Sequence, residues 1–513
     1  MAVTGILLTC LAALLIYLAV RLYSKYPSSK VRALVEKIPG PPARPIVGHA
    51  HIFKRGAEFY EQLHTLCKEY GHKGIIRAWL GYHCLVVATN ANAAEVLLKS
   101  STHMTKSFLY DFIRPWLGTG LLMLISTGSK WHARRKMITP TFHFKILEDF
   151  LEVFNEQSTV MTKHLEKMAG KSKGFDVIPF VTLCALDIIC DTAMGRHVNA
   201  QAHSDSEYVQ AIYRISDLIM ERIRRPWLWP DGIYRLLPAG KEHERLLTVL
   251  HSFTNEVIRE RTAEWERHLA SDSDKDSATT DKPSLIGGRK RLAFLDMLLH
   301  ASAKHQLTVE DIREEVDTFM FEGHDTTSAA ISWAIHLIGA NPEVQKKVHD
   351  ELDQIFGQSD RLVTMDDIKQ MKYLECVVKE SLRLFPSVPM MAREIAEDCT
   401  INGFFVPKGS TGVIQTSVIH RDPDYFPEPE AFKPERFTNE NSVGRHPFCY
   451  IPFSAGLRNC IGQKFAMIEE KVLLSSILRH FQIASLQKRG DLMPSGEIIL
   501  RSQNGINIKL EKR

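Results

Sequence analysis

The stretch Pro452-Phe453-Ser454-Ala455-Gly456-Leu457-Arg458-Asn459-Cys460-Ile461-Gly462 decides the fold of this chain. A run with helical spacing of apolar residues, 463–481, follows it directly, so Cys460 stands at a helix start. Aligned backbone N–H groups and the positive end of the helix dipole favour a thiolate there. Gly456 and Gly462 bracket the cysteine, and glycine lets the backbone turn tightly and a large flat ligand come close.

A lone cysteine at a turn is usually buried and inert. The full pattern Phe-x-x-Gly-x-Arg-x-Cys-x-Gly is far more specific, and it resembles the haem-thiolate loop of the cytochrome P-450 superfamily. The resemblance implies that Cys460 is the axial ligand of a haem b iron and that Phe453 and Arg458 belong to the cofactor site. Leu457 departs from the pattern, because many microsomal members carry proline there and the loop loses one fixed φ angle.

Length and composition fit a large globular protein. The chain has 513 residues, of which 44% are hydrophobic and 24% charged, with a net charge of +4. That small positive charge, without basic blocks interleaved with aromatics, gives no reason to expect nucleic acid as a partner. The nine cysteines are scattered without C-x-x-C pairs, which favours a reducing compartment over a disulfide framework.

The N-terminus predicts a membrane anchor. Val3 to Val20 is uncharged, and as a helix it spans about 27 Å, close to the thickness of an endoplasmic reticulum bilayer. Basic residues follow it and none precedes it, which places the C-terminal bulk in the cytosol and argues against a cleaved signal peptide. We expect an anchor at 1–22, a basic, proline-rich hinge at 23–48 and a catalytic domain at 49–513.

A long predicted helix, 310–339, carries polar residues at its middle. A glycine and two threonines there cost helix propensity, and such local conflicts often mark function. Glu322, Asp325 and Thr326 are spaced i, i+3 and i+4, which predicts one shared face, and Gly323 leaves a gap against which a flat ring can lie. This segment resembles the family's oxygen-activating segment, which implies that Thr326 bonds oxygen or water and that Asp325 relays protons.

Two further motifs gain meaning only beside the haem loop. Trp131 and Arg135 are four residues apart, and they resemble the family's propionate-binding pair, with Arg393 at the spacing of another propionate contact. Glu-x-x-Arg is by itself a common surface ion pair of little value. Glu380 and Arg383, together with the downstream Arg436, resemble the family's structural ion cluster under the haem loop.

The resemblance implies a fold that is mainly α with small β-sheets, preceded by an N-terminal transmembrane helix. Helices are predicted at 57–70 and 373–384, and strands within 78–89 and 391–417. The stretch from 105 to 128 is predicted to be an irregular loop with short helical pieces. A polar stretch, 271–288, is expected to be a surface connection.

Glu322 narrows the resemblance to microsomal family four, the fatty-acid omega-hydroxylases, most like subfamily V. The resemblance implies medium- to long-chain substrates, including polyunsaturated fatty acids, and a possible ester between Glu322 and a haem methyl. It also implies membrane lipids as neighbours and NADPH–cytochrome P-450 reductase as the electron donor, because no dinucleotide or flavin module is recognisable. Residues 134, 136 and 464 are a candidate basic docking surface for that donor.

Two other functions stay open. One is a haem-thiolate isomerase or dehydratase that acts on lipid peroxides without a reductase, against which Asp325 and Thr326 argue. The other is a haem-binding sensor without turnover.

Overall fold

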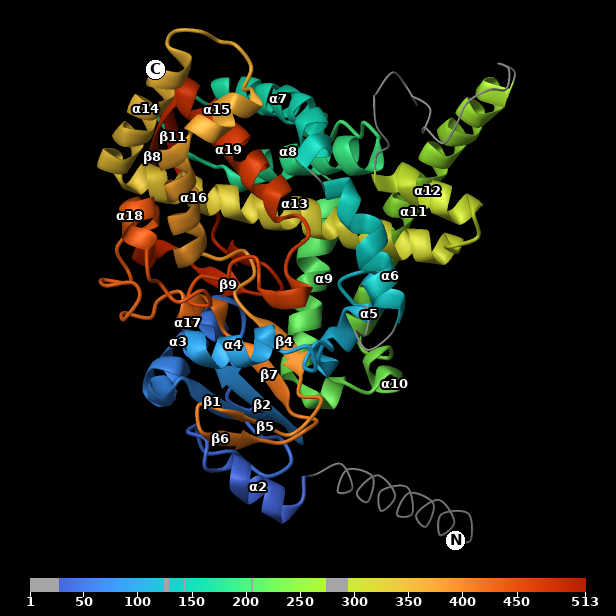
Figure 1. Ribbon diagram of the computed structural model, residues 1–513, viewed down its shortest axis with the longest axis vertical. Helices are drawn as coiled ribbons and strands as arrows, with labels where there is room; N and C mark the ends of the chain where they lie inside the picture. Colours follow the sequence, from blue (N-terminus) through green and yellow to red (C-terminus); the bar gives the residue numbers. More distant parts are fainter. Residues whose placement is uncertain (1–26, 124–128, 143, 204–205, 274–293) are drawn as a thin grey trace.

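The computed structural model describes residues 27–123, 129–142, 144–203, 206–273 and 294–513 (Figure 1). Helices dominate, which confirms the predicted mainly α fold. The largest of the small sheets lies at the lower end of the view, and another lies at the upper end near the C-terminus. Within those ranges no helix is both long and apolar enough to cross a bilayer. The predicted anchor, 1–22, lies outside the described residues.

Helix α13 (Val309–Ala340) is the central element, and its bounds follow from its sequence. Thr308 caps its first turn in a capping box with Asp311, and Pro342 opens the next helix, α14 (Pro342–Phe356). Its middle is buried almost all round, because α8 (Ile178–Ile189), α16 (Lys372–Leu384) and α19 (Gln463–His480) pack against it. An all-round apolar helix is stable only in such a core.

The remaining helices surround this centre. The longer ones are α3 (Gly56–Tyr70), α4 (Ala91–Lys99), α6 (Ser129–Ile138), α7 (Phe144–Glu166), α9 (Glu207–Arg224), α11 (Pro238–Ser273) and α12 (Phe294–Ala303). The short ones are α2 (Ser29–Val35), α5 (Arg114–Leu117), α10 (Asp231–Tyr234), α15 (Met365–Gln370), α17 (Thr416–Ile419) and α18 (Asn439–Ser442). Pro179 and Pro238 lie in the first turns of α8 and α11, where proline needs no N–H partner.

The sheets are small. The largest has the order β1-β2-β7-β4, with β2 parallel to β7 and the other pairs antiparallel. Its strands are β1 (Ile75–Leu80), β2 (His83–Ala88), β7 (Thr411–Ile414) and β4 (Met391–Glu394). The others are β3 (Phe175–Asp176), β11 (Asn507–Lys512) and β8 (Phe481–Ser485) in one sheet, β9 (Pro494–Gly496) with β10 (Leu500–Ser502), and β5 (Cys399–Ile401) with β6 (Phe404–Val406).

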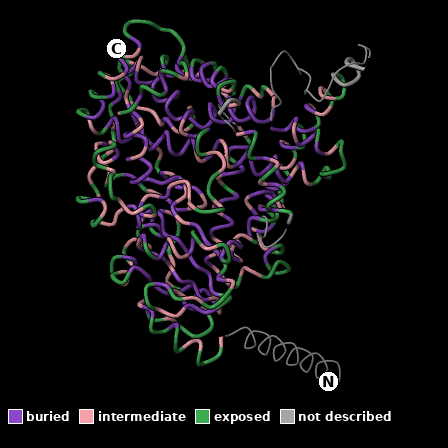
Figure 2. The backbone as a smooth tube through the Cα atoms, in the orientation of Figure 1, coloured by how far each residue is buried: buried purple, intermediate pink, exposed green. Residues whose placement is uncertain are grey.

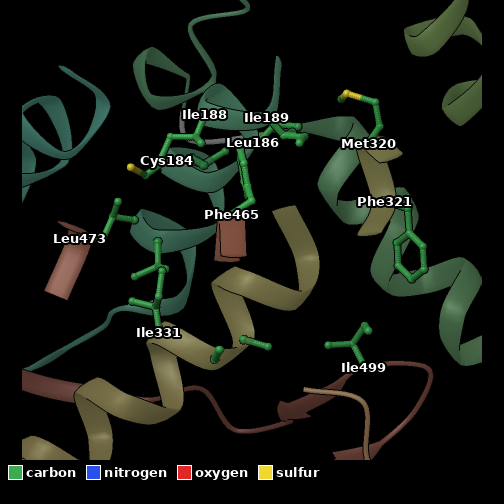
Figure 3. Packing of buried hydrophobic residues seen from close by; sticks show 14 of the residues in the cluster. Cys184, Leu186, Ile188, Ile189, Met320, Phe321, Ile331, Phe465, Leu473 and Ile499 are labelled. Atoms are coloured by element: carbon green, nitrogen blue, oxygen red, sulfur yellow. The ribbon is translucent and has the colours of Figure 1, made fainter. Parts of the chain in front are cut away.

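The two largest apolar clusters lie among the central helices and at the four-stranded sheet. The larger one joins α8, α13 and α19 (Figure 3), where Ile189, Met320 and Leu473 are almost fully buried. The smaller one lies at the four-stranded sheet, and Val35 and Ile38 are fully buried in it. The segment predicted as a hinge therefore contains α2, which packs onto the catalytic domain. Buried residues run through the interior and exposed ones line the periphery (Figure 2).

Arg383 of α16 uses all of its donors inside the protein. Its Nε and Nη2 donate to the two Glu380 oxygens at 2.7 and 2.8 Å. Its remaining donors bond the carbonyls of His420, Pro429 and Ala431 at 3.1, 2.7 and 3.1 Å. Arg436 lies 3.4 Å from Glu380 through Nε. The predicted cluster of these three side chains is thus assembled, and Arg383 ties α16 to the loop 420–431.

We expect Arg383→Met to lower the free energy of unfolding by about 3–5 kcal/mol, because Glu380 would stay buried without its main cation. Arg436→Met is the matched control and should cost only about 1–2 kcal/mol, since Arg383 still neutralises Glu380. Urea unfolding followed by circular dichroism measures both. Equal losses for the two variants would contradict the central role of Arg383.

Candidate active site

The Cys460 loop is held by its own backbone before α19 begins. The Cys460 N–H donates to the Phe453 carbonyl at 2.9 Å, and the Ser454 N–H donates to the Ile451 carbonyl at 3.0 Å. Cys460 is exposed, and its sulfur opens to a cavity deep in the protein. Desolvation by the surrounding protein raises the pKa of the Cys460 thiol to about 11, and Glu322 adds to the rise. The backbone N–H groups of residues 462 and 463 act in the opposite direction, as expected at a helix start. A metal ion at the sulfur would deprotonate it outright.

The two glycines of the loop have different roles. Gly456 has a φ of +71°, and a Cβ there would stand 2.0 Å from the Leu98 carbonyl oxygen, so this glycine lets the loop pack on α4. It does not line the cofactor cavity. A Cβ on Gly462 would meet only the Cys460 sulfur, at 3.9 Å, so the space above Gly462 opens toward the cavity.

The Cys460 sulfur faces a cavity of about 1350 Å³ of empty space. The loop forms one wall, and α13 forms another with Glu322, Gly323 and Thr326. Most of the predicted site residues meet here: Trp131, Arg135, Glu322, Thr326, Arg393, Phe453, Arg458, Cys460 and Gly462. Gly323 is required chiefly by packing, because a Cβ there would collide with Ile189 of α8 at 2.5 Å.

Four cations line this cavity: Lys106, Arg135, Arg393 and Arg458. The two acids among the lining residues are Glu322 and Glu470, and burial raises the pKa of both. The cavity therefore holds excess positive charge beside apolar walls and a thiol. A flat apolar ring with carboxylate substituents, such as haem, fits this set of groups.

Sequence reasoning missed Lys106, whose Nζ lies 4.5 Å from the centre of the Tyr110 ring. Burial lowers its pKa, and Arg393 and Arg458 lower it further. A single lysine shortly before the run Phe108-Leu109-Tyr110 was the only signal for it.

The arginines also shape the loop itself. Arg135 donates to the backbone carbonyl and to the side-chain Oδ1 of Asn459, both at 2.9 Å. It therefore fixes the position of the residue before the cysteine. Arg458 donates to the Leu122 carbonyl at 3.1 Å and lies 4.7 Å above the Trp131 ring. Two arginines that line the cavity therefore also position the loop.

Asp325 does not share the cavity face with Glu322 and Thr326, so that prediction is wrong. Its carboxylate is fully buried and forms an ion pair with Arg501 of β10, on another side of α13. Around a helix, residue i+3 turns to one side of residue i, and residue i+4 turns to the other. Counted from Glu322, only the side of Thr326 (i+4) lines the cavity, and Asp325 (i+3) does not. The Thr326 hydroxyl donates to the Glu322 carbonyl at 2.7 Å.

Arg134 is not part of a docking surface, which corrects a second expectation. Its side chain is 5% exposed and forms ion pairs with Asp311 at 2.6 Å and with Glu315 at 3.2 Å. Lys136 and Lys464 are exposed, as expected. Burial decides between neighbouring basic residues of α6, because one face of the helix packs on α13.

A second space, of about 1540 Å³, adjoins the first. Glu322, Thr326 and Tyr110 line both, so the two spaces meet at this wall. Its walls are mostly aliphatic and aromatic, including Phe53, Phe59, Leu63, Ile113, Met220 and Ile499. We call it the apolar channel.

These features define a haem-thiolate site. A family model described as Cytochrome P450 matches residues 38–510. Cytochrome P450 4V2 of Homo sapiens is 53% identical over 92% of this chain and 89% of its own length. Cytochrome P450 4c3 of Drosophila melanogaster is 48% identical over 98% of this chain and 94% of its own. The chain belongs to the cytochrome P450 family and, within it, to family 4, subfamily V. It is a P450 monooxygenase.

Cys460→Ser should abolish the red-shifted band of the reduced CO complex, because that band requires a thiolate ligand. Absorbance spectroscopy measures the band, and extractable haem measures occupancy. Cys449→Ser is the matched control, since Cys449 is buried in a separate apolar cluster, and it should keep the band. Survival of the band in the Cys460 variant would remove that residue as ligand.

Proposed function

We propose that this monooxygenase is a fatty-acid omega-hydroxylase that uses O2 and electrons from NADPH. The observation that carries the proposal is the apolar channel, which leads to the cavity of Cys460 and suits an unbranched hydrocarbon chain. Membership of family 4 supports fatty acids as the substrate class. The resemblance to subfamily V suggests medium- to long-chain members, including polyunsaturated ones.

The chemistry divides between cofactor and chain. Haem with a cysteinate ligand supplies the activation of O2. Backbone N–H groups at residues 462 and 463 tune the sulfur, and the Thr326 hydroxyl offers a proton donor and acceptor at the cavity wall. Asp325 can relay protons to Thr326 only when its ion pair with Arg501 is broken. We therefore propose that Asp325 is the second residue of the relay and that opening of this ion pair controls it.

The electron donor we propose is NADPH–cytochrome P-450 reductase. Lys136 and Lys464 are exposed and suit an acidic partner surface. We further propose that residues 1–22 anchor the chain once in the endoplasmic reticulum membrane, with residues 23–48 as the connection and the catalytic domain 49–513 in the cytosol.

A fatty-acid series from C8 to C22, incubated with full-length protein, reductase and NADPH, tests the function. We expect the terminal carbon to be the main oxidation site and NADPH use to depend on the reductase. Product formation from lipid hydroperoxides without reductase would instead identify an isomerase or dehydratase. Substrate binding without any product would identify a sensor.

We also propose that Glu322 would form an ester with a haem methyl group. The new C–O bond would replace one methyl C–H bond, whose proton and two electrons would be removed by the oxidant that O2 and NADPH supply during turnover. Burial raises the pKa of Glu322, which shows the cost of keeping its charge there, while Lys106 acts in the opposite direction. An ester removes that charge and holds the cofactor rigidly. This rigidity would favour attack on the stronger terminal C–H bond.

After sustained turnover, part of the haem should stay with the polypeptide through acid–organic extraction. Glu322→Ala should release all of it and shift products toward the penultimate carbon. Glu322→Gln keeps the size of the side chain without the carboxylate and should behave in the same way in the extraction. Complete extraction from the wild type would refute the ester.

A further inference from the structure

Arg224 is a cation inside the apolar channel. It is the last residue of α9, its side chain is 6% exposed, and it lines the channel but not the cavity of Cys460. Its guanidinium lies 5.0 Å from the centre of the Phe59 ring. It therefore stands apart from the thiol, at a wall that is otherwise mostly hydrocarbon.

Several other polar residues of the channel have partners within the protein. Arg77 donates to the Pro41 carbonyl at 3.0 Å and pairs with Glu36 at 2.5 Å. His49 and Gln415 bond protein groups at 3.1 Å, namely the Pro41 carbonyl and the Ser417 hydroxyl. None of the residues that the structure describes forms a hydrogen bond or an ion pair with the Arg224 side chain. Its contact with the Phe59 ring is a cation–π interaction.

The nearby acids do not neutralise Arg224 directly. Glu497 also lines the channel, but it accepts from Ser495 at 3.3 Å and lies 3.7 Å from Arg501. Asp217 and Glu221 act on Arg224 only through their field. A guanidinium stays charged in a protein, so burial without a paired anion is costly. An anion that enters the channel recovers part of that cost.

We propose that Arg224 binds the carboxylate of the substrate and so determines which end of the chain reaches Cys460. This rests on the proposed function and adds the group that reads the acid. The planar guanidinium matches a carboxylate in a two-point contact. With the acid end held at α9, the hydrocarbon occupies the apolar channel and the methyl end points to the wall of Glu322 and Thr326.

The test compares free fatty acids with their methyl esters of equal chain length. Substrate-induced shifts of the haem absorption give dissociation constants without turnover, and product analysis gives the position of oxidation. The full-length protein is used as wild type, Arg224→Met and Arg224→Lys. Arg225→Met is the matched control. It removes the same charge from the next residue, whose side chain pairs with Glu221 and does not line the channel.

We expect Arg224→Met to weaken binding of the free acid roughly ten- to hundredfold and to leave the ester unchanged. Arg224→Lys should recover part of the loss, and Arg225→Met should change neither ligand. Internal oxidation products should rise in Arg224→Met. The wild type itself should prefer the acid to the ester by a similar factor, which tests the proposal even if Arg224→Met fails to fold.

Equal weakening of acid and ester, or no acid preference in the wild type, overturns the role of Arg224. These failures are distinct from failure of the proposed function. Fatty acids that bind the wild type with an Arg224-dependent acid preference, but are not hydroxylated at the terminal carbon, would refute omega-hydroxylation and support the anchor. A wild type that binds no fatty acid would refute both.

Discussion

The complete use of the Arg383 donors is the constraint on which the cysteine loop depends. One of those donors holds the His420 carbonyl, and the His420 Nε2 accepts from the Ile451 backbone N–H at 2.8 Å. Burial lowers the pKa of His420 to about 3, so the ring stays neutral and can accept. The buried pair of Arg383 and Glu380 is thus connected to the segment before Cys460 by two hydrogen bonds, one at the His420 carbonyl and one at its imidazole.

Charge explains the division of labour around α13. The cavity of Cys460 gathers four cations against two acids whose pKa values burial raises, so it is built for an anionic ligand. Asp325, one turn further along α13, is neutralised by Arg501 instead. One helix therefore contributes both to the cavity wall and to a structural ion pair, because adjacent parts of its surface meet different neighbours.

The apolar channel can hold a hydrocarbon chain but does not set its direction. A mostly hydrocarbon wall provides affinity that is proportional to the area buried but cannot by itself orient a chain. Orientation needs a polar group at one end, and in an environment of low dielectric a single cation has a large effect. Arg224 and the cavity of Cys460 would supply the two ends.

Helical spacing was enough to predict the central helix and the shared face of Trp131 and Arg135, since residues four apart on a helix share a face. The resemblance of the cysteine loop to a known family implied the mainly α fold and the place of these two residues at one cavity. Only the tertiary structure decided that Arg134 is buried while Lys136 is exposed, that Lys106 joins the cofactor cavity and that Arg224 lies in the channel. It also decided that Asp325 turns to Arg501, 176 residues away in sequence. The physical reason is that burial and ion pairing depend on which distant elements pack together, and sequence spacing carries no information on that.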